Sequence, residues 1–145
     1  MSGMVRVTEV GPRDGLQNER AQVPVADKVA FVNALIAAGF PEVEVTSFVS
    51  PKWVPQLADG AEVMRQATRR AGTVLSALVP NERGLQSALE ARVDKVSVFA
   101  SASEGFSQRN VNASIAECLA RLQPVVQQAR AAGLPVRGYV SCVVR

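Results

Sequence analysis

Arginine and aspartate stand side by side at Arg13-Asp14, just after an apolar run that Gly11-Pro12 ends. A carboxylate suits a hard divalent cation, and a guanidinium suits a carboxylate, a thioester oxygen or an enolate. An ion pair that only fixes the loop is the other interpretation. Glu44 is a second candidate, because a charge in a buried parallel strand faces either a polar site or solvent. Together these residues predict an anion or metal site.

Other polar residues carry weaker signals. Tyr139 either orients a ligand or completes a core, and Asn110 either contacts a substrate or forms a turn. The sequence has no Gly-x-Gly-x-x-Gly after its first apolar run and no phosphate-binding loop, which argues against a nucleotide site. It also has no histidine, so a histidine base or an imidazole metal ligand cannot come from these residues.

Short β-rich runs alternate with helical stretches along the whole chain, and this alternation indicates where the candidate side chains lie in the fold. Strands are predicted over 5–10, 42–49, 74–79, 95–100 and 136–144, and helices over 26–38, 60–70, 82–91 and 114–132. Ser114 and Glu117 form a capping-box pattern at the start of the last helix. Such alternation predicts parallel strands with right-handed crossovers. A doubly wound sheet and part of a (β/α)8 barrel both fit, and ligands bind at the carboxyl ends of the strands in either.

Composition bounds the class of protein. The 145 residues carry a formal net charge of +3 with no clustered basic stripe, so no nucleic-acid partner is expected. No run of 18 apolar residues occurs, so no membrane partner is expected either. Cys118 and Cys142 both lie in apolar segments and are predicted to be buried, reduced thiols of a cytoplasmic protein.

Four stretches resemble the 3-hydroxy-3-methylglutaryl-CoA lyase family. They are the run 9–19 around Arg13-Asp14, the run 44–56 that contains Ser-Phe-Val-Ser-Pro-Lys-Trp, the region of Phe99, Ala102-Ser103-Glu104 and Asn110, and Arg-Gly-Tyr-Val-Ser-Cys at 137–142. The resemblance implies a (β/α)8 TIM barrel, of which residues 1–145 form a single partial domain with about the first four and a half β/α units. It also implies cleavage of 3-hydroxy-3-methylglutaryl-CoA to acetyl-CoA and acetoacetate.

The resemblance also implies roles for individual residues. Asp14 matches the ligand of a divalent metal, Mg²⁺ or Mn²⁺, and Arg13 matches the residue that stabilises the enolate oxygen. Glu44 matches a catalytic carboxylate close to the metal and the substrate. The remaining substrate contacts that it implies are Gln17, Asn110 and Tyr139.

The sequence departs from the family in one respect that bears on activity. Family members complete the metal site with a His-x-His pair and an asparagine, and use a cysteine of a later loop for proton transfer. None of these has a counterpart here, so we expect the isolated chain to be inactive. A lyase for a longer branched 3-hydroxyacyl-CoA and an inactive acyl-CoA-binding fragment are the alternatives. Because half a barrel leaves open strand edges, we expect a homodimer or association with the missing half-barrel.

Overall fold

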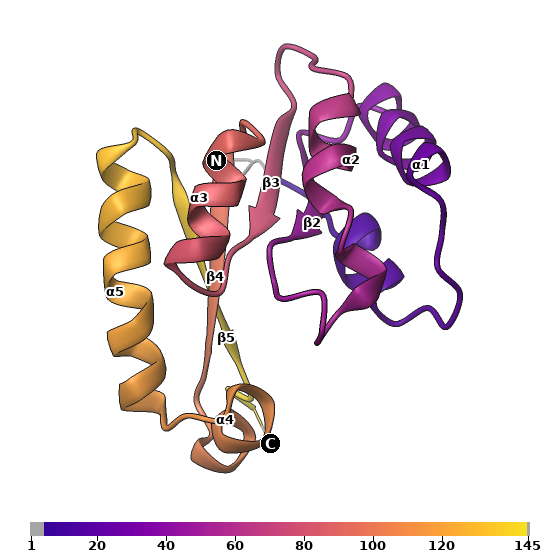
Figure 1. The fold of residues 1–145 in the computed structure, drawn as a ribbon. Coiled ribbons are helices and arrows are strands. Elements are labelled where there is room, and N and C mark those ends of the chain that lie inside the picture. The colour runs from indigo at the N-terminus through magenta and orange to yellow at the C-terminus, as the bar shows by residue number, and fades with distance from the viewer. Residues whose placement is uncertain (1–4, 145) are drawn as a thin grey trace.

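The protein is described by a computed structural model over residues 5–144. Five parallel strands form one sheet in the order β1-β2-β3-β4-β5 (Figure 1). Their bounds are β1 Thr8–Glu9, β2 Glu42–Ser47, β3 Val74–Leu78, β4 Lys95–Ser101 and β5 Val136–Ser141. Spatial order follows chain order without reversal, as in a barrel, whereas a doubly wound sheet reverses its order at a switch point. The barrel interpretation is therefore the one that the strand order supports.

Helices connect the strands and cover one face of the sheet (Figure 1). Their bounds are α1 Val25–Ala37, α2 Gly60–Gln66, α3 Glu82–Glu90, α4 Glu104–Val111 and α5 Ile115–Ala131, with a π-helical turn η1 Gly11–Gly15 and a 3-10 turn η2 Pro55–Leu57. Buried apolar side chains such as Val32 of α1, Met64 of α2, Leu85 of α3 and Val125 of α5 pack against the strands. The core therefore lies between sheet and helices, which leaves the opposite face of the sheet for polar side chains.

The sheet is strongly curved. In a flat sheet β2 and β5 would lie about 14 Å apart, because two other strands separate them. Nevertheless the Tyr139 hydroxyl of β5 donates a hydrogen bond of 2.9 Å to Glu44 of β2. Arg137 of β5 likewise donates to the Thr8 hydroxyl of β1 at 3.0 Å. The first, second and fifth strands thus converge on the concave face, which is the interior of a half-barrel.

Most predicted elements are confirmed, with several differences. The strands predicted over 42–49 and 136–144 end at Ser47 and Ser141. The first strand is only Thr8–Glu9, because the chain turns into η1 at Gly11. The helix predicted over 60–70 ends at Gln66, where Ala67 becomes extended. Helix α4 was not predicted, because its sequence is polar and lacks an apolar stripe.

The prediction of two buried cysteines is wrong for one of them. Cys118 is buried on α5, whereas Cys142 is exposed just beyond the end of β5. Its backbone φ of 59° shows that the strand has already ended there, so the side chain leaves the pleated pattern that predicted burial.

None of the helices within residues 5–144 combines the length and apolarity that crossing a bilayer requires.

Candidate functional site

The Arg13–Glu44 ion pair is the centre of the site. Arg13 lies in η1, directly beyond β1, where the backbone N–H groups of Arg13 and Asp14 both donate to the Val10 carbonyl, at 3.0 and 2.7 Å. From this tight turn the guanidinium reaches Glu44 of β2. Arg13 Nε donates to Glu44 Oε1 at 2.6 Å. A charge-assisted contact of this length fixes the guanidinium over the concave face.

Glu44 is fully buried, with 0% of its side chain exposed. Its second oxygen, Oε2, accepts hydrogen bonds from Ser97 Oγ of β4 at 2.8 Å and from the Tyr139 hydroxyl of β5 at 2.9 Å. A buried carboxylate is costly unless it is paired and hydrogen-bonded, and Glu44 meets both conditions. Three donors from three parts of the chain therefore hold one carboxylate in a single orientation. Of the two interpretations of Glu44 left open by the sequence, the polar site is the one that the fold realises.

Asp14 lies at the open side of the pair. Its side chain is 57% exposed, and its Oδ1 accepts from Arg13 Nη1 at 2.8 Å. The donor set suits a hard cation, since an accessible carboxylate oxygen is the ligand type that Mg²⁺ and Mn²⁺ prefer. No cluster of three or more potential His, Cys, Asp or Glu ligands occurs within residues 5–144. Asp14 therefore fits the role of one oxygen ligand, and the described residues alone do not build a complete metal site.

The environment of Tyr139 keeps its hydroxyl protonated. Burial raises the pKa of Tyr139, and the neighbouring Glu44 carboxylate raises it further. The hydrogen bond from Arg137 acts in the opposite direction but does not outweigh these effects. The phenol is accordingly a hydrogen-bond donor to Glu44 rather than a base.

Two of the predicted substrate contacts do not join this cluster. Gln17 is half-buried on the turn that follows η1, and Asn110 is exposed on α4. Among the hydrogen bonds of the described residues, neither side chain reaches the Arg13–Glu44 pair. Their assignment as substrate contacts stays a prediction.

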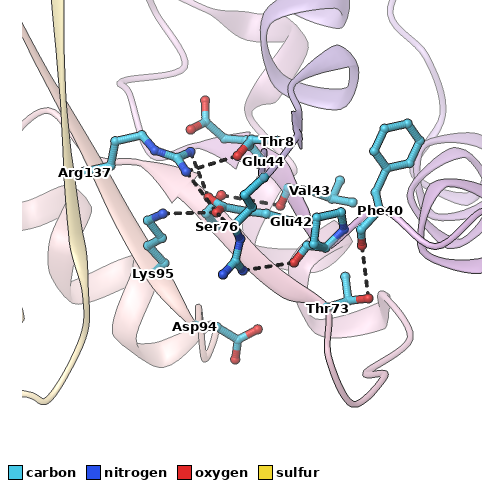
Figure 2. Close-up of polar contacts among 12 residues, drawn as sticks. Thr8, Phe40, Glu42, Val43, Glu44, Thr73, Ser76, Asp94, Lys95 and Arg137 are labelled. Atoms are coloured by element: carbon cyan, nitrogen blue, oxygen red, sulfur yellow. Dashed lines mark hydrogen bonds and ion pairs between the residues drawn. The ribbon is translucent and has the colours of Figure 1, made fainter. Parts of the chain in front are cut away.

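Sequence reasoning missed a second charged cluster on the same face, nearer the amino ends of the strands. Figure 2 shows Glu42 between Lys95 and Arg137. Lys95 Nζ donates to Glu42 Oε2 at 3.0 Å, and Arg137 Nη2 donates to the same oxygen at 2.9 Å. Arg137 Nη1 lies 2.8 Å from Glu42 Oε1.

Strand periodicity is the signal that identifies this second cluster. Side chains two positions apart on a strand share a face of the sheet. The pairs with this spacing are Glu42 and Glu44 on β2, Lys95 and Ser97 on β4, and Arg137 and Tyr139 on β5. A strand that directs the second residue of its pair into the barrel therefore directs the first there as well.

The pKa values of Glu42 and Arg137 in this second cluster follow from their ion pair and hydrogen bonds. Burial of Glu42 opposes ionisation, but the hydrogen bonds from Lys95 and Arg137 outweigh it and leave the pKa of Glu42 below its ordinary value. Burial acts against the charged form of Arg137, yet its hydrogen bonds to Tyr139 and Glu42 leave its pKa raised. Glu42 and Arg137 are thus both charged at neutral pH.

Comparison with known proteins places this geometry in a family. The family model described as HMGL-like matches residues 4–145. The chain is 55% identical over 140 residues to the 3-hydroxy-3-isohexenylglutaryl-CoA/hydroxy-methylglutaryl-CoA lyase of Pseudomonas aeruginosa, covering 97% of this chain and 47% of that protein. It is 51% identical over 140 residues to the mitochondrial hydroxymethylglutaryl-CoA lyase of Gallus gallus, with the same coverage. The chain therefore spans about half the length of these curated relatives.

Solved structures agree with the sequence matches. The HMG-CoA lyase of Brucella melitensis superposes with a TM-score of 0.95 at 54% identity, covering 97% of this chain and 50% of that one. An HMG-CoA lyase described as a complex with coenzyme A and 3-methylmalate superposes with a TM-score of 0.89 at 36% identity, covering 94% of this chain and 45% of that one. The predicted TIM-barrel class is confirmed, with this chain as the half-barrel.

Proposed function

The chain belongs to the HMGL-like family, and from that premise we propose that it forms the first half of a carbon–carbon lyase that cleaves 3-hydroxy-3-methylglutaryl-CoA to acetyl-CoA and acetoacetate. The single observation that carries the proposal is the Arg13–Glu44 pair of 2.6 Å, which holds a guanidinium from the turn after β1 against the buried carboxylate of β2. Lyase names among relatives up to 55% identical support the same chemistry.

The reaction defines what Arg13 would do. The tertiary hydroxyl of the substrate gives up its proton, and its oxygen becomes a carbonyl as the adjacent carbon–carbon bond breaks. The electron pair of that bond passes into the thioester as an enolate, whose terminal carbon then takes up a proton to give acetyl-CoA. Within residues 5–144, the hydrogen bonds of Arg13 use Nε and Nη1. Nη2 can therefore donate to the enolate oxygen, where a fixed positive charge lowers the barrier.

Glu44 would position the guanidinium rather than act as a base. Both of its oxygens already accept hydrogen bonds, from Arg13 on one side and from Ser97 and Tyr139 on the other. A carboxylate held in this way restricts Arg13 to one orientation before the substrate arrives, which is the preorganisation that electrostatic catalysis requires.

Asp14 would hold the divalent cation, Mg²⁺ or Mn²⁺, as one of its oxygen ligands. Such an ion, when bound, acts as a Lewis acid that eases deprotonation of a hydroxyl and polarises a neighbouring carboxylate. Asp14 is exposed beside Arg13, so it would present its free oxygen on the side from which the substrate approaches. We assign the further substrate contacts to Gln17, Asn110 and Tyr139, and the ligand to an acyl-CoA. A lyase relative solved in complex with coenzyme A and 3-methylmalate supports that ligand class.

A second candidate substrate is a longer branched 3-hydroxyacyl-CoA. The observation that favours it is the name of the Pseudomonas aeruginosa relative, which includes 3-hydroxy-3-isohexenylglutaryl-CoA as well as the methyl compound. The ratio of kcat/KM for the two thioesters would separate the candidates. A ratio well above one for the longer acyl chain would favour the second candidate.

A chimera provides the test of the lyase proposal. Residues of this chain would replace the 140 matched residues of the Pseudomonas aeruginosa relative, which supplies the rest of the barrel. We expect acetyl-CoA release that depends on added Mg²⁺ or Mn²⁺, and its loss by about 100-fold or more in Arg13→Met, as for removal of an oxyanion donor. The matched control is Arg83→Met on α3, where the arginine is exposed. A folded but inactive chimera would favour the alternative of an inactive acyl-CoA-binding fragment.

The 145-residue chain by itself would be a poor lyase, because Asp14 is its only proposed metal ligand. We propose that it associates through the edge of the sheet, as a homodimer or with the other half of a barrel. An apolar groove runs between α5 and the edge strand β5, and Leu119 and Val140 beside it are 54% and 59% exposed. Sedimentation velocity tests this proposal. A stable monomer at micromolar concentration would contradict it.

We also propose that the protein works in the cytoplasm. Both cysteines are free thiols in the structure. The 3-hydroxy-3-methylglutaryl-CoA lyase of Rattus norvegicus that is named cytoplasmic is 50% identical to the chain, although the Gallus gallus relative is named mitochondrial. Cell fractionation with an antibody to the chain would decide the location.

A further inference from the structure

The two charged clusters on the concave face are joined by a continuous series of polar contacts. Arg137 lies at the junction. Below, its Nη2 donates to Glu42 at 2.9 Å, and above, its Nη1 donates to the Tyr139 hydroxyl at 3.3 Å. Tyr139 then donates to Glu44 at 2.9 Å, and Glu44 accepts from Arg13 at 2.6 Å. The series thus runs from Glu42, at the amino end of β2, to the Arg13 guanidinium in the turn after β1.

The spacing along β5 makes this junction possible. Arg137 and Tyr139 are two residues apart, so they point to the same face, and Arg137 also lies below the Tyr139 ring at 5.7 Å from its centroid. A planar guanidinium with several donors can contact the carboxylate and the phenol at the same time. Glu42 anchors that guanidinium: its Oε2 accepts from Nη2 at 2.9 Å, and its Oε1 lies 2.8 Å from Nη1, the nitrogen that donates to Tyr139.

We propose that Arg137, anchored by Glu42, is a positioning residue that fixes the Tyr139 phenol and, through it, the Glu44–Arg13 pair. The proposal deepens the lyase function above in one respect: it makes the orientation of the guanidinium depend on an ion pair at the other end of the strands. Arg137 itself does not touch the reacting atoms in this scheme.

Several charged groups surround the phenol and determine how it titrates. Glu44 of β2 accepts a hydrogen bond from Tyr139, and Arg137, on the same strand as Tyr139, donates one to it. Arg13 in turn contacts Glu44, and Glu42 contacts Arg137. The Arg137 hydrogen bond lowers the pKa of Tyr139, whereas burial and Glu44 raise it. Loss of the contact with Arg137 therefore raises the pKa of Tyr139 further.

The chain has one tyrosine, so its phenolate absorbance reports this side chain alone. At about pH 11, one unit above the ordinary tyrosine pKa, we expect a smaller phenolate fraction in Arg137→Met than in the wild-type chain. Unfolding would have the opposite effect, because a solvated tyrosine ionises near its ordinary value of about 10. Arg83→Met is the matched control and should leave the fraction unchanged. An unchanged fraction in folded Arg137→Met would overturn the proposal.

Arg137→Lys carries the test if the methionine variant does not fold. It keeps the charge beside Glu42, but one ammonium group cannot also reach the phenol, so the phenolate fraction should again fall below that of the wild-type chain. A wild-type fraction in this folded variant would equally overturn the proposal.

The kinetic consequence is measured in the lyase chimera. Because a positioning residue supports the transition state without binding substrate, Arg137→Met should lower kcat by about 10- to 100-fold with a smaller change in KM. An unchanged kcat would overturn the role in catalysis. If the unaltered chimera has no activity, the lyase proposal fails, while the absorbance measurement still decides whether Arg137 holds Tyr139.

Discussion

Glu42 should contribute more to stability than any exposed carboxylate of the chain. Its side chain is 0% exposed and contacts Lys95 and Arg137, whose side chains are only 17% and 24% exposed. Glu42→Gln keeps the size and removes the charge, which leaves two largely buried cations without their counter-charge. Removing one partner of a buried ion pair costs about 3–5 kcal/mol. Since domains have a free energy of unfolding of about 5–15 kcal/mol, the loss would be a large share of the total.

The pH dependence of stability gives this prediction a second signature. In the folded state the pKa of Glu42 is lowered, because its hydrogen bonds to Lys95 and Arg137 outweigh the effect of burial. Its contribution is therefore complete above the ordinary glutamate pKa of about 4.3 and is lost as the pH falls through the lowered folded value. The wild-type chain should lose this increment on acidification, whereas Glu42→Gln has none to lose.

Urea unfolding followed by far-ultraviolet circular dichroism measures both effects. Glu90→Gln on α3 is the matched control, because Glu90 is exposed, and its effect should stay within about 0.5 kcal/mol. Combining Glu42→Gln with Lys95→Met should cost less than the sum of the two single changes, since the pair is coupled. A loss below about 1 kcal/mol for Glu42→Gln, the size typical of exposed ion pairs, would refute the argument that the buried pairing stabilises the fold.

Two further predictions concern the packing around α1 and α2. Lys28 is buried and donates to both oxygens of Asp59 at 2.7 and 2.8 Å, so Lys28→Met should cost about 1.5–3 kcal/mol in urea unfolding. Lys52→Met, at an exposed lysine, should change little, and equal losses in both would contradict the role of the ion pair. Gly60→Ala should cost about 1–3 kcal/mol, because the new Cβ would overlap Thr46 Oγ1 and lie 2.9 Å from its Cγ2. Thr46→Ala in the same chain should recover part of that loss, and a neutral Gly60→Ala would show that the helix moves freely.

The features predictable from sequence are those that depend on local spacing. Ser114 caps α5 as predicted: its hydroxyl accepts from the Glu117 N–H at 3.1 Å, and Glu117 accepts from the Ser114 N–H at 2.7 Å. Both partners lie within one turn, so a four-residue pattern contains all the information. Helix α4 has a cap at Ser103, whose hydroxyl accepts from the Phe106 N–H, but the polar sequence of α4 does not show the apolar periodicity that predicts a helix. The contact of Glu104 with the Ile115 N–H, at 3.1 Å, ties α4 to a segment that the pattern of α4 cannot specify.

The candidate site was predictable only in part. The Arg13-Asp14 pair and Glu44 were identified because they interrupt apolar runs at informative places. Tyr139 was predicted as a substrate contact, but its hydrogen bond to Glu44 was not, and Ser97 was not identified at all. The two residues lie 95 and 53 positions beyond Glu44, on other strands, so no local pattern connects them to it.

The sequence by itself determined the β/α alternation and the parallel sheet, because both follow from residue spacing over short stretches. The family was indicated by the resemblance of the runs 9–19 and 44–56. Only the tertiary structure decided that Glu44 faces the interior and that Glu42 pairs with Lys95 and Arg137. The physical reason is that a period of two assigns side chains to a common face without saying which face is concave. The curvature of the sheet, which brings β5 opposite β2, arises from the packing of all five strands, and it is this curvature that joins the two charged clusters.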